Sequence, residues 1–340
     1  MAGSPQRSPA LPNSKIEWAK GYGTLTAGKT APVSTTSIFQ AASTTKLLAS
    51  AIVLRLVEQG RFDLDTDVNT YLQSWRIPED DFTTKEKVTL RRLLTHQSGL
   101  NRPEGGFSLD EGSVPTLVQV LKGESPATNK PAVIEFEPGS RWEYSNFDFV
   151  VIQLLLEEAL GKPLNEIARE TVFDPLGMSS STLVYPLSPD LAGREAMPHD
   201  AAGKTAAPQL HPTAVAQGGL LTTPSDLALL TIELINAYQG KSDRLISKET
   251  ARRMFQTEVQ LDPRILGFPM GQGLGAFVRG EGKAFSFLHP GDNDPGASSW
   301  LIAYPELGQG VVIMTNGAMG NMLAMEIMTA LSAEYGWPGE

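Results

Sequence analysis

The chain of 340 residues contains no cysteine and only four histidines. Disulfide bonds and thiolate chemistry are therefore excluded. Basic residues are also few, because 28 lysines and arginines stand against 38 aspartates and glutamates, which gives a formal net charge of −10 at pH 7. Nucleic acids and anionic membrane surfaces both require a basic footprint on the protein. Neither is expected as a partner.

Long apolar runs are also lacking. The longest, near Phe149–Leu156, is too short to span a bilayer. The opening MAGSPQRSPALPNSK has no apolar core of a signal peptide, so the chain as written is expected in the cytoplasm unless an export signal has been removed, which leaves the compartment open. Residues 1–14 are rich in proline and serine, which predicts a flexible tail.

The composition is that of a folded globular protein, with 41% apolar and 19% charged residues. A chain of this length tends to divide its core, so two lobes are expected. Strand-like runs lie near both ends and helical patterns lie between them. This order predicts an α+β fold, with an antiparallel sheet lobe from residues 15–60 and 216–340 and an inserted, mainly helical lobe from residues 61–215. A site between the lobes is expected.

Local patterns predict the main elements. Apolar residues recur at helical spacing over residues 43–59, and Gly60 supplies a stop. Thr223 suits a helix cap with Pro224 as the first helical residue. A last helix is predicted over about residues 321–335. The last third otherwise contains four short strand-like runs: GLGAFVRG, AFSFLHPG, SSWLIAYP and QGVVIMTN.

The segment GTLTAGKT, residues 23–30, fits the phosphate-loop pattern G-x-x-x-x-G-K-[ST]. Such a loop needs a helix start directly after it, so that backbone N–H groups face the phosphates. Here Pro32 and a cluster of serine and β-branched residues follow instead. The preceding KIEWAKGY is a plausible strand. A hairpin turn is therefore the better interpretation.

The segment AASTTKLLAS carries the first chemical candidate. Ser43 opens the predicted helix and Lys46 follows one turn later on the same face. A serine needs a base to become a nucleophile, and a lysine can serve when burial lowers its pKa. The helix N-terminus disfavours the ammonium and favours an oxyanion. A pattern this short also arises by chance, with Ser43 as a cap and Lys46 as a surface residue.

Two further segments follow in order. WEYSNFDF puts Tyr144 and Asn146 just before a helix, where a phenol could relay a proton and an amide could bind a carbonyl. Packing of the ring and capping of the helix are the plainer alternatives. FLHPGDNDPG puts His289 and Gly291 on a strand, where glycine permits close approach of a substrate. The other histidines are interpreted as loop packing or surface residues: His96, His199 and His211.

Together, STTK, YSN and HPG resemble the serine β-lactamase and penicillin-binding protein superfamily, in particular its class C-like branch. That branch includes the family VIII carboxylesterases and D-amino-acid-specific peptidases. Each pattern as found here occurs once and in the family's order. The framework over residues 16–337 is similar too, in segments such as VTLRRLLTHQSGL, FDPLGM and GGLLTTPSDLA. The resemblance implies a two-lobed fold, a sheet flanked by helices with an all-helical insertion.

The resemblance also implies roles. Ser43 would attack a carbonyl and become acylated, while Lys46 and Tyr144 would share the proton transfers. Asn146 would orient the acyl chain. Water would then release the acyl group, with no metal or organic cofactor.

The wall strand of the site is implied in the same way. His289 and Gly291 would line it, and the oxyanion hole would join the backbone N–H of Ser43 to one on that strand, by position that of Asp292. The third motif departs from the family at Pro290, which removes a hydroxyl and an N–H. His289 is also a poorer fixed cation than lysine. Both departures favour a simple ester or D-amino-acid amide over a β-lactam.

Three hypotheses follow. The first is a serine hydrolase acting on carboxylic esters, with small-molecule substrates and an open oligomeric state. The second is a β-lactamase or D,D-peptidase of the penicillin-binding type. The third is a catalytically inactive binding protein on the same scaffold.

A further departure from the family is that only fourteen residues precede Lys15, where the family has a helix and a strand.

Overall fold

A computed structural model describes residues 15–103, 113–209, 211–265 and 267–338, and the predicted tail at 1–14 lies outside them. Within these residues the larger of two sheets is antiparallel throughout, with the strand order β3-β4-β5-β6-β7-β8. Its strands are β3 (Val259–Gln260), β4 (Gly271–Gln272), β5 (Phe277–Arg279), β6 (Ser286–Asn293), β7 (Ala297–Tyr304) and β8 (Gln309–Thr315). A small second sheet pairs β1 (Phe39–Gln40) with β2 (Leu221–Thr222).

Helices make up most of the remaining regular structure. They are α1 (Thr45–Glu58), α2 (Leu90–Leu94), α3 (Leu117–Lys122), α4 (Phe147–Leu160), α5 (Leu164–Ala168), α6 (Asp174–Leu176), α7 (Pro224–Gln239), α8 (Lys248–Met254) and α9 (Gly320–Tyr335). Thr223 caps α7 by accepting a hydrogen bond from the Asp226 N–H, as predicted. Together with the antiparallel sheet, these helices confirm the predicted α+β class.

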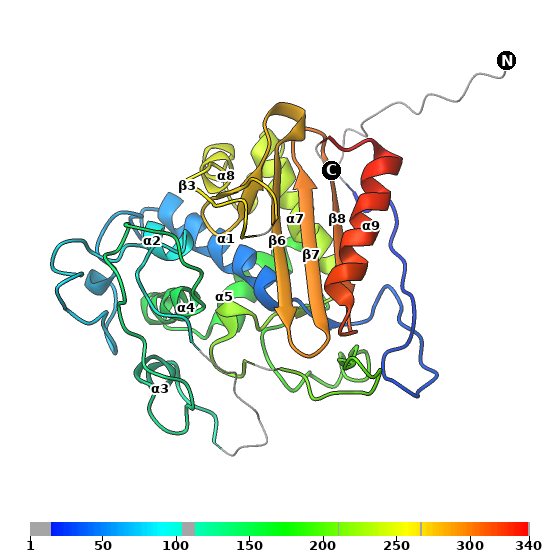
Figure 1. Ribbon diagram of the computed structural model, residues 1–340, viewed down its shortest axis with the longest axis horizontal. Coiled ribbons are helices and arrows are strands. Elements are labelled where there is room, and N and C mark those ends of the chain that lie inside the picture. Colours follow the sequence, from blue (N-terminus) through cyan, green and yellow to red (C-terminus); the bar gives the residue numbers. More distant parts are fainter. Residues whose placement is uncertain (1–14, 104–112, 210, 266, 339–340) are drawn as a thin grey trace.

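The sheet is covered on both faces, which explains why every residue of β7 is buried. Successive side chains of a strand point to opposite faces. Trp300 and Ile302 pack with Met328 of α9, whereas Leu301 and Ala303 belong to the larger cluster that includes α1 and α7. Figure 1 shows α9 beside β7 and β8 on one side of the molecule, with the helices α2, α3 and α4 on the other.

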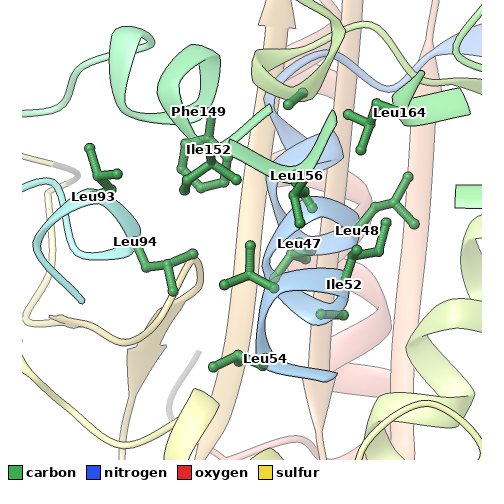
Figure 2. Packing of buried hydrophobic residues seen from close by; sticks show 14 of the residues in the cluster. Leu47, Leu48, Ile52, Leu54, Leu93, Leu94, Phe149, Ile152, Leu156 and Leu164 are labelled. Atoms are coloured by element: carbon green, nitrogen blue, oxygen red, sulfur yellow. The ribbon is translucent and has the colours of Figure 1, made fainter. Parts of the chain in front are cut away.

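Helix α1 lies at the centre of that larger cluster, and eleven of its fourteen residues are buried. Figure 2 shows Leu47 of α1 close to Leu156 of α4, with leucines of α2 and α5 around them. Burying one such side chain contributes roughly 1.5–3 kcal/mol. The helix that begins just after Ser43 is therefore held on all sides, which fixes the position of the site.

The N-terminal segment agrees with one prediction and corrects another. GTLTAGKT is a hairpin turn as predicted, since Thr24 bridges Pro32 and the Leu25 N–H donates to the Ala31 carbonyl. KIEWAKGY is not a strand. Trp18 and Tyr22 are 54% and 72% exposed, so no sheet face buries them. The two-lobed division stays a prediction, because one apolar cluster runs through both ranges.

Candidate active site

Ser43 lies in a tight turn between β1 and α1, within a short 3₁₀ segment (Ala42–Thr44). Ala42 before it has φ +46°, a left-handed conformation that costs a residue with a Cβ on the order of 1–3 kcal/mol. Ala42 and Thr44 are buried, whereas Ser43 is half-buried. The turn thus presents the Ser43 hydroxyl toward accessible space.

Hydrogen bonds fasten this turn to the main sheet. The Thr44 hydroxyl lies 2.6 Å from the Ser299 Oγ and donates to the His289 carbonyl at 3.3 Å. The Ser299 hydroxyl donates to the Ala41 carbonyl at 2.5 Å. These side chains, which the sequence analysis did not single out, set the distance between Ser43 and β6.

Lys46 is fully buried, and its side-chain nitrogen has three oxygen partners. Nζ lies 3.1 Å from the Ser43 Oγ, 2.9 Å from the Asn146 Oδ1 and 2.5 Å from the Gln217 carbonyl oxygen. Burial lowers the pKa of Lys46 well below its ordinary value, and Arg102 adds to that effect while Asp148 opposes it. An uncharged amine can accept the proton of Ser43. The predicted pairing of Ser43 with Lys46 is present in the geometry.

Tyr144 is the second hydroxyl at Ser43. Its side chain hydrogen-bonds to Ser43, and the Lys46 Nζ lies 5.0 Å from the centre of its ring. Burial raises the pKa of Tyr144 above its ordinary value, more than the Ser43 hydrogen bond and Arg102 lower it. The phenol is therefore protonated at neutral pH and available as a proton donor.

Asn146 precedes α4 but its side chain does not cap that helix. Its amide oxygen accepts from Lys46 instead, so the capping alternative is wrong.

The wall strand β6 runs beside the Ser43 turn. A Cβ on Gly291 would lie 2.5 Å from the Ala41 carbonyl oxygen and 3.0 Å from the Ser43 nitrogen, so only glycine permits this approach. His289 is buried, and its Nδ1 donates to the Pro290 carbonyl at 2.7 Å. Burial and then the nearby Lys46 lower the pKa of His289 to about 3. His289 is thus uncharged, and β6 brings no cation at this position.

Asp292 lies at the exposed side of β6, and its carboxylate accepts a hydrogen bond from the Ser298 hydroxyl at 3.0 Å. The part assigned to its backbone N–H in an oxyanion hole stays a prediction. Among the described residues, no group of three or more histidine, aspartate or glutamate side chains could hold a metal ion.

Two histidines differ from their sequence interpretation. His211 and His199 are half-buried rather than surface residues. The His211 Nδ1 lies 3.2 Å from the Gln217 Nε2, and its ring lines a cavity of about 20 Å³ together with Gln40 and Gly218. Burial and the proximity of Lys46 lower the pKa of His211 to about 4.

His96 does pack in a loop, as predicted, but against the site itself. Its ring centre lies 4.3 Å from that of Tyr144, and its Nδ1 lies 2.7 Å from an oxygen of Asp148. The sequence carries a signal for Asp148, which is the one acid in the mainly apolar run FDFVVIQLLL. Arg102, whose charge acts on both Lys46 and Tyr144, carried no comparable signal.

Comparisons with known proteins find relatives over most of the chain. A family model described as Beta-lactamase matches residues 11–331. The peptidase named "D-alanyl-D-alanine-carboxypeptidase/endopeptidase AmpH" of Escherichia coli (strain K12) is 26% identical over 91% of this chain and 72% of its own. Esterase EstB of Burkholderia gladioli is 28% identical over 89% of this chain and 83% of its own.

Solved structures show the same fold. The octameric penicillin-binding protein homologue from Pyrococcus abyssi superposes with a TM-score of 0.74 at 24% identity, over 95% of this chain and 71% of that one. The D-amino acid amidase from Ochrobactrum anthropi SV3, complexed with L-phenylalanine, gives 0.72 at 21% identity, over 92% and 89%.

The chain belongs to the beta-lactamase family. Its fold is therefore that of the β-lactamases and penicillin-binding proteins, as the motifs implied. As an enzyme it is a serine hydrolase of this family, related to esterases and carboxypeptidases. No helix in the described part of the chain is both long and apolar enough to cross a membrane.

Proposed function

We propose that this serine hydrolase cleaves uncharged carboxylic esters through an acyl-enzyme on Ser43. The observation that carries the proposal is the buried Lys46 amine, which lies 3.1 Å from the Ser43 Oγ and whose pKa burial lowers. A base with a lowered pKa next to a hydroxyl is the arrangement that activates a serine.

Each residue of the site has its own part in the proposed reaction. Lys46 takes the proton of the Ser43 hydroxyl as Oγ bonds to the ester carbonyl carbon. The negative charge on the carbonyl oxygen is held by the backbone N–H groups of Ser43 and Asp292. Tyr144 gives its proton to the departing alkoxide as the bond to the carbonyl carbon breaks, and Lys46 passes the proton it took to the Tyr144 phenolate. Asn146 orients both Lys46 and the acyl group. Water then attacks the acyl carbon and gives a proton to Lys46. The bond between the acyl carbon and Oγ breaks, Lys46 returns the proton to Oγ, and the carboxylic acid leaves.

The preference for uncharged esters is supported by the wall strand. Pro290 offers neither a hydroxyl nor an N–H, and the lowered pKa of His289 leaves it uncharged. A substrate carboxylate therefore finds no charged partner at these positions. We further propose that the site lies between the sheet lobe and the helical lobe.

A second function, hydrolysis of D-amino-acid peptides or amides, is favoured by Arg102. Its side chain is exposed, and its charge acts on both Lys46 and Tyr144. A guanidinium there could bind a substrate carboxylate. The names of two relatives, a D-alanyl-D-alanine carboxypeptidase and a D-amino acid amidase, point the same way.

The test is hydrolysis of p-nitrophenyl butyrate by the wild type and by Ser43→Ala. Loss of at least 1,000-fold in the variant is expected, because removal of the nucleophile leaves only weak residual catalysis. Equal rates in both proteins would refute the role of Ser43. Nitrocefin, a D-alanyl-D-alanine peptide and the Arg102→Ala variant separate the two functions. Peptide cleavage that depends on Arg102 and exceeds ester cleavage would favour the second.

A further inference from the structure

A buried acid–base pair lies behind Tyr144, and no step of the proposed reaction uses it. His96 and Asp148 are 1% and 0% exposed. The His96 Nδ1 lies 2.7 Å from one Asp148 oxygen, and the Ser98 hydroxyl donates to the other. Buried ionisable groups are costly unless paired, so such a pair inside the core calls for an explanation.

The pair adjoins both proton carriers of the site. The ring centres of His96 and Tyr144 are 4.3 Å apart, and the Lys46 Nζ lies 5.0 Å from that same Tyr144 ring centre. Asp148 is in the first turn of α4, two residues after Asn146, whose Oδ1 accepts from Lys46. A charge change at Asp148 is therefore felt at Lys46.

The backbone at His96 is strained and also supports Tyr144. Only Ala42 and His96, among the described non-glycine residues, have positive φ, +46° and +55°. Ala42 directly precedes Ser43, and the ring of His96 packs against the ring of Tyr144. The His96 carbonyl accepts the Glu143 N–H at 2.9 Å, and the Ser145 N–H approaches the His96 Nδ1 at 3.4 Å. Strained residues that persist tend to cluster at functional sites.

One shared proton keeps the pair neutral. Burial raises the pKa of Asp148 and lowers that of His96, and both shifts favour uncharged side chains. The Ser145 N–H points at the His96 Nδ1, which marks that nitrogen as an acceptor for a proton from the Asp148 carboxyl group 2.7 Å away. A bare Asp148 carboxylate would instead favour a protonated Lys46. The other charged or titratable groups facing this region are Tyr144 before α4, Arg102, His289 on β6 and His211.

We propose that His96 is a positioning residue that holds the ring of Tyr144 and, by sharing a proton with Asp148, withholds a negative charge from Lys46. The base then stays uncharged at the pH of turnover. The inference rests on the proposed function of Ser43 and Lys46. It assigns a role to a histidine–aspartate pair that takes part in no step of the proposed reaction.

The decisive variant is His96→Phe, which keeps an aromatic ring against Tyr144 but cannot share the proton. Without the His96 nitrogen, the protonated form of Asp148 loses its hydrogen bond, so Asp148 ionises more readily. Its negative charge then favours a protonated Lys46, and the acid limb of the pH profile of kcat/KM should move up by about one pH unit. That is about a tenfold loss of activity at pH values below the limb. The double variant His96→Phe/Asp148→Asn removes the charge and should return the limb to within about 0.3 unit of the wild type.

Labelling of Ser43 by a fluorophosphonate at pH 9, followed by mass spectrometry, shows whether the altered sites remain intact. His96→Phe should be labelled there within about threefold of the wild-type rate, because alkaline pH favours the uncharged form of Lys46, whose pKa burial lowers. His199→Phe is the matched control, since His199 lies beyond β8 where it bridges Gly317. Its pH profile should not move.

A structural role alone predicts a loss equal at every pH that Asp148→Asn does not rescue, and that result overturns the inference. If His96→Phe does not fold, the pH profiles of kcat/KM of His96→Gln and of the single Asp148→Asn variant test the inference in its place. The limb of Asp148→Asn must lie at or below that of the wild type, and an upward shift overturns the inference. A wild type without Ser43-dependent turnover overturns the proposed function and the inference together. An active wild type with an unmoved His96→Phe limb overturns only the inference.

Discussion

Replacing Gly291 by alanine tests how closely catalysis depends on the spacing between Ser43 and β6. The added Cβ would lie 2.5 Å from both the Ala41 carbonyl oxygen and the Ser299 Oγ, and 3.0 Å from the Ser43 nitrogen. An ordinary contact begins at 3.4 Å, so β6 and the Ser43 turn must separate by 3.4 − 2.5 = 0.9 Å. A misplacement of about 1 Å costs on the order of 100-fold in rate.

We therefore expect Gly291→Ala to lower kcat/KM for p-nitrophenyl butyrate about 100-fold. Overpacking of this kind destabilises by roughly 1–3 kcal/mol, so the unfolding midpoint should fall by several degrees and the protein should remain folded at 25 °C. Gly317→Ala is the matched control, since a Cβ there meets nothing within 4 Å and its φ is not positive. If a folded Gly291→Ala enzyme keeps its activity within threefold, the assignment of β6 as the wall of the site is wrong.

Two further variants test the electrostatics and the shape of the site. Lys46→Met removes a group whose folded-state pKa burial lowers below that of the unfolded chain. Between those two pKa values the unfolded wild type binds the extra proton, so its free energy of unfolding should rise by about 1.4 kcal/mol per pH unit relative to the variant. Chemical denaturation from pH 7 to 10 measures this, and a constant difference would contradict a lowered pKa. His211→Ala should enlarge the cavity of about 20 Å³, which is near the size of one water. Gly218, which lines this cavity, lies against the Ala42 backbone beside Ser43, so we expect the cavity to take the acyl chain. Ratios of kcat/KM for octanoate over acetate esters should then rise about tenfold in His211→Ala, whereas a uniform loss at all chain lengths would exclude an acyl pocket there.

The three motifs could be read from the sequence because each depends on local spacing. Ser43 and Lys46 share a helical turn, and Asn146 is tied to the start of α4. The long strands were predictable from turn residues between apolar runs. β3 and β4 were missed because two residues cannot show a period.

Other parts of the site depend on contacts between distant segments. Lys46 donates to the backbone carbonyl of Gln217, which any residue at that position would supply. His211 was interpreted as a surface residue because the loop that buries it has no periodic pattern. Asp148 had a visible signal as an acid in an apolar helix, but its partner His96 is 52 positions away.

The strain around Ser43 persists because neighbouring segments fix the turn from several sides. The Ala41 N–H donates to the Leu220 carbonyl at 2.8 Å, and the Thr45 hydroxyl donates to the Ala42 carbonyl at 2.6 Å. Ser299 holds the Ala41 carbonyl from β7. Because the left-handed residue lies between these bonds, relaxing its φ would break them together, which costs more than the roughly 1–3 kcal/mol of strain. The turn that exposes the nucleophile is thus held by the sheet and by α1, and its geometry does not depend on a bound substrate.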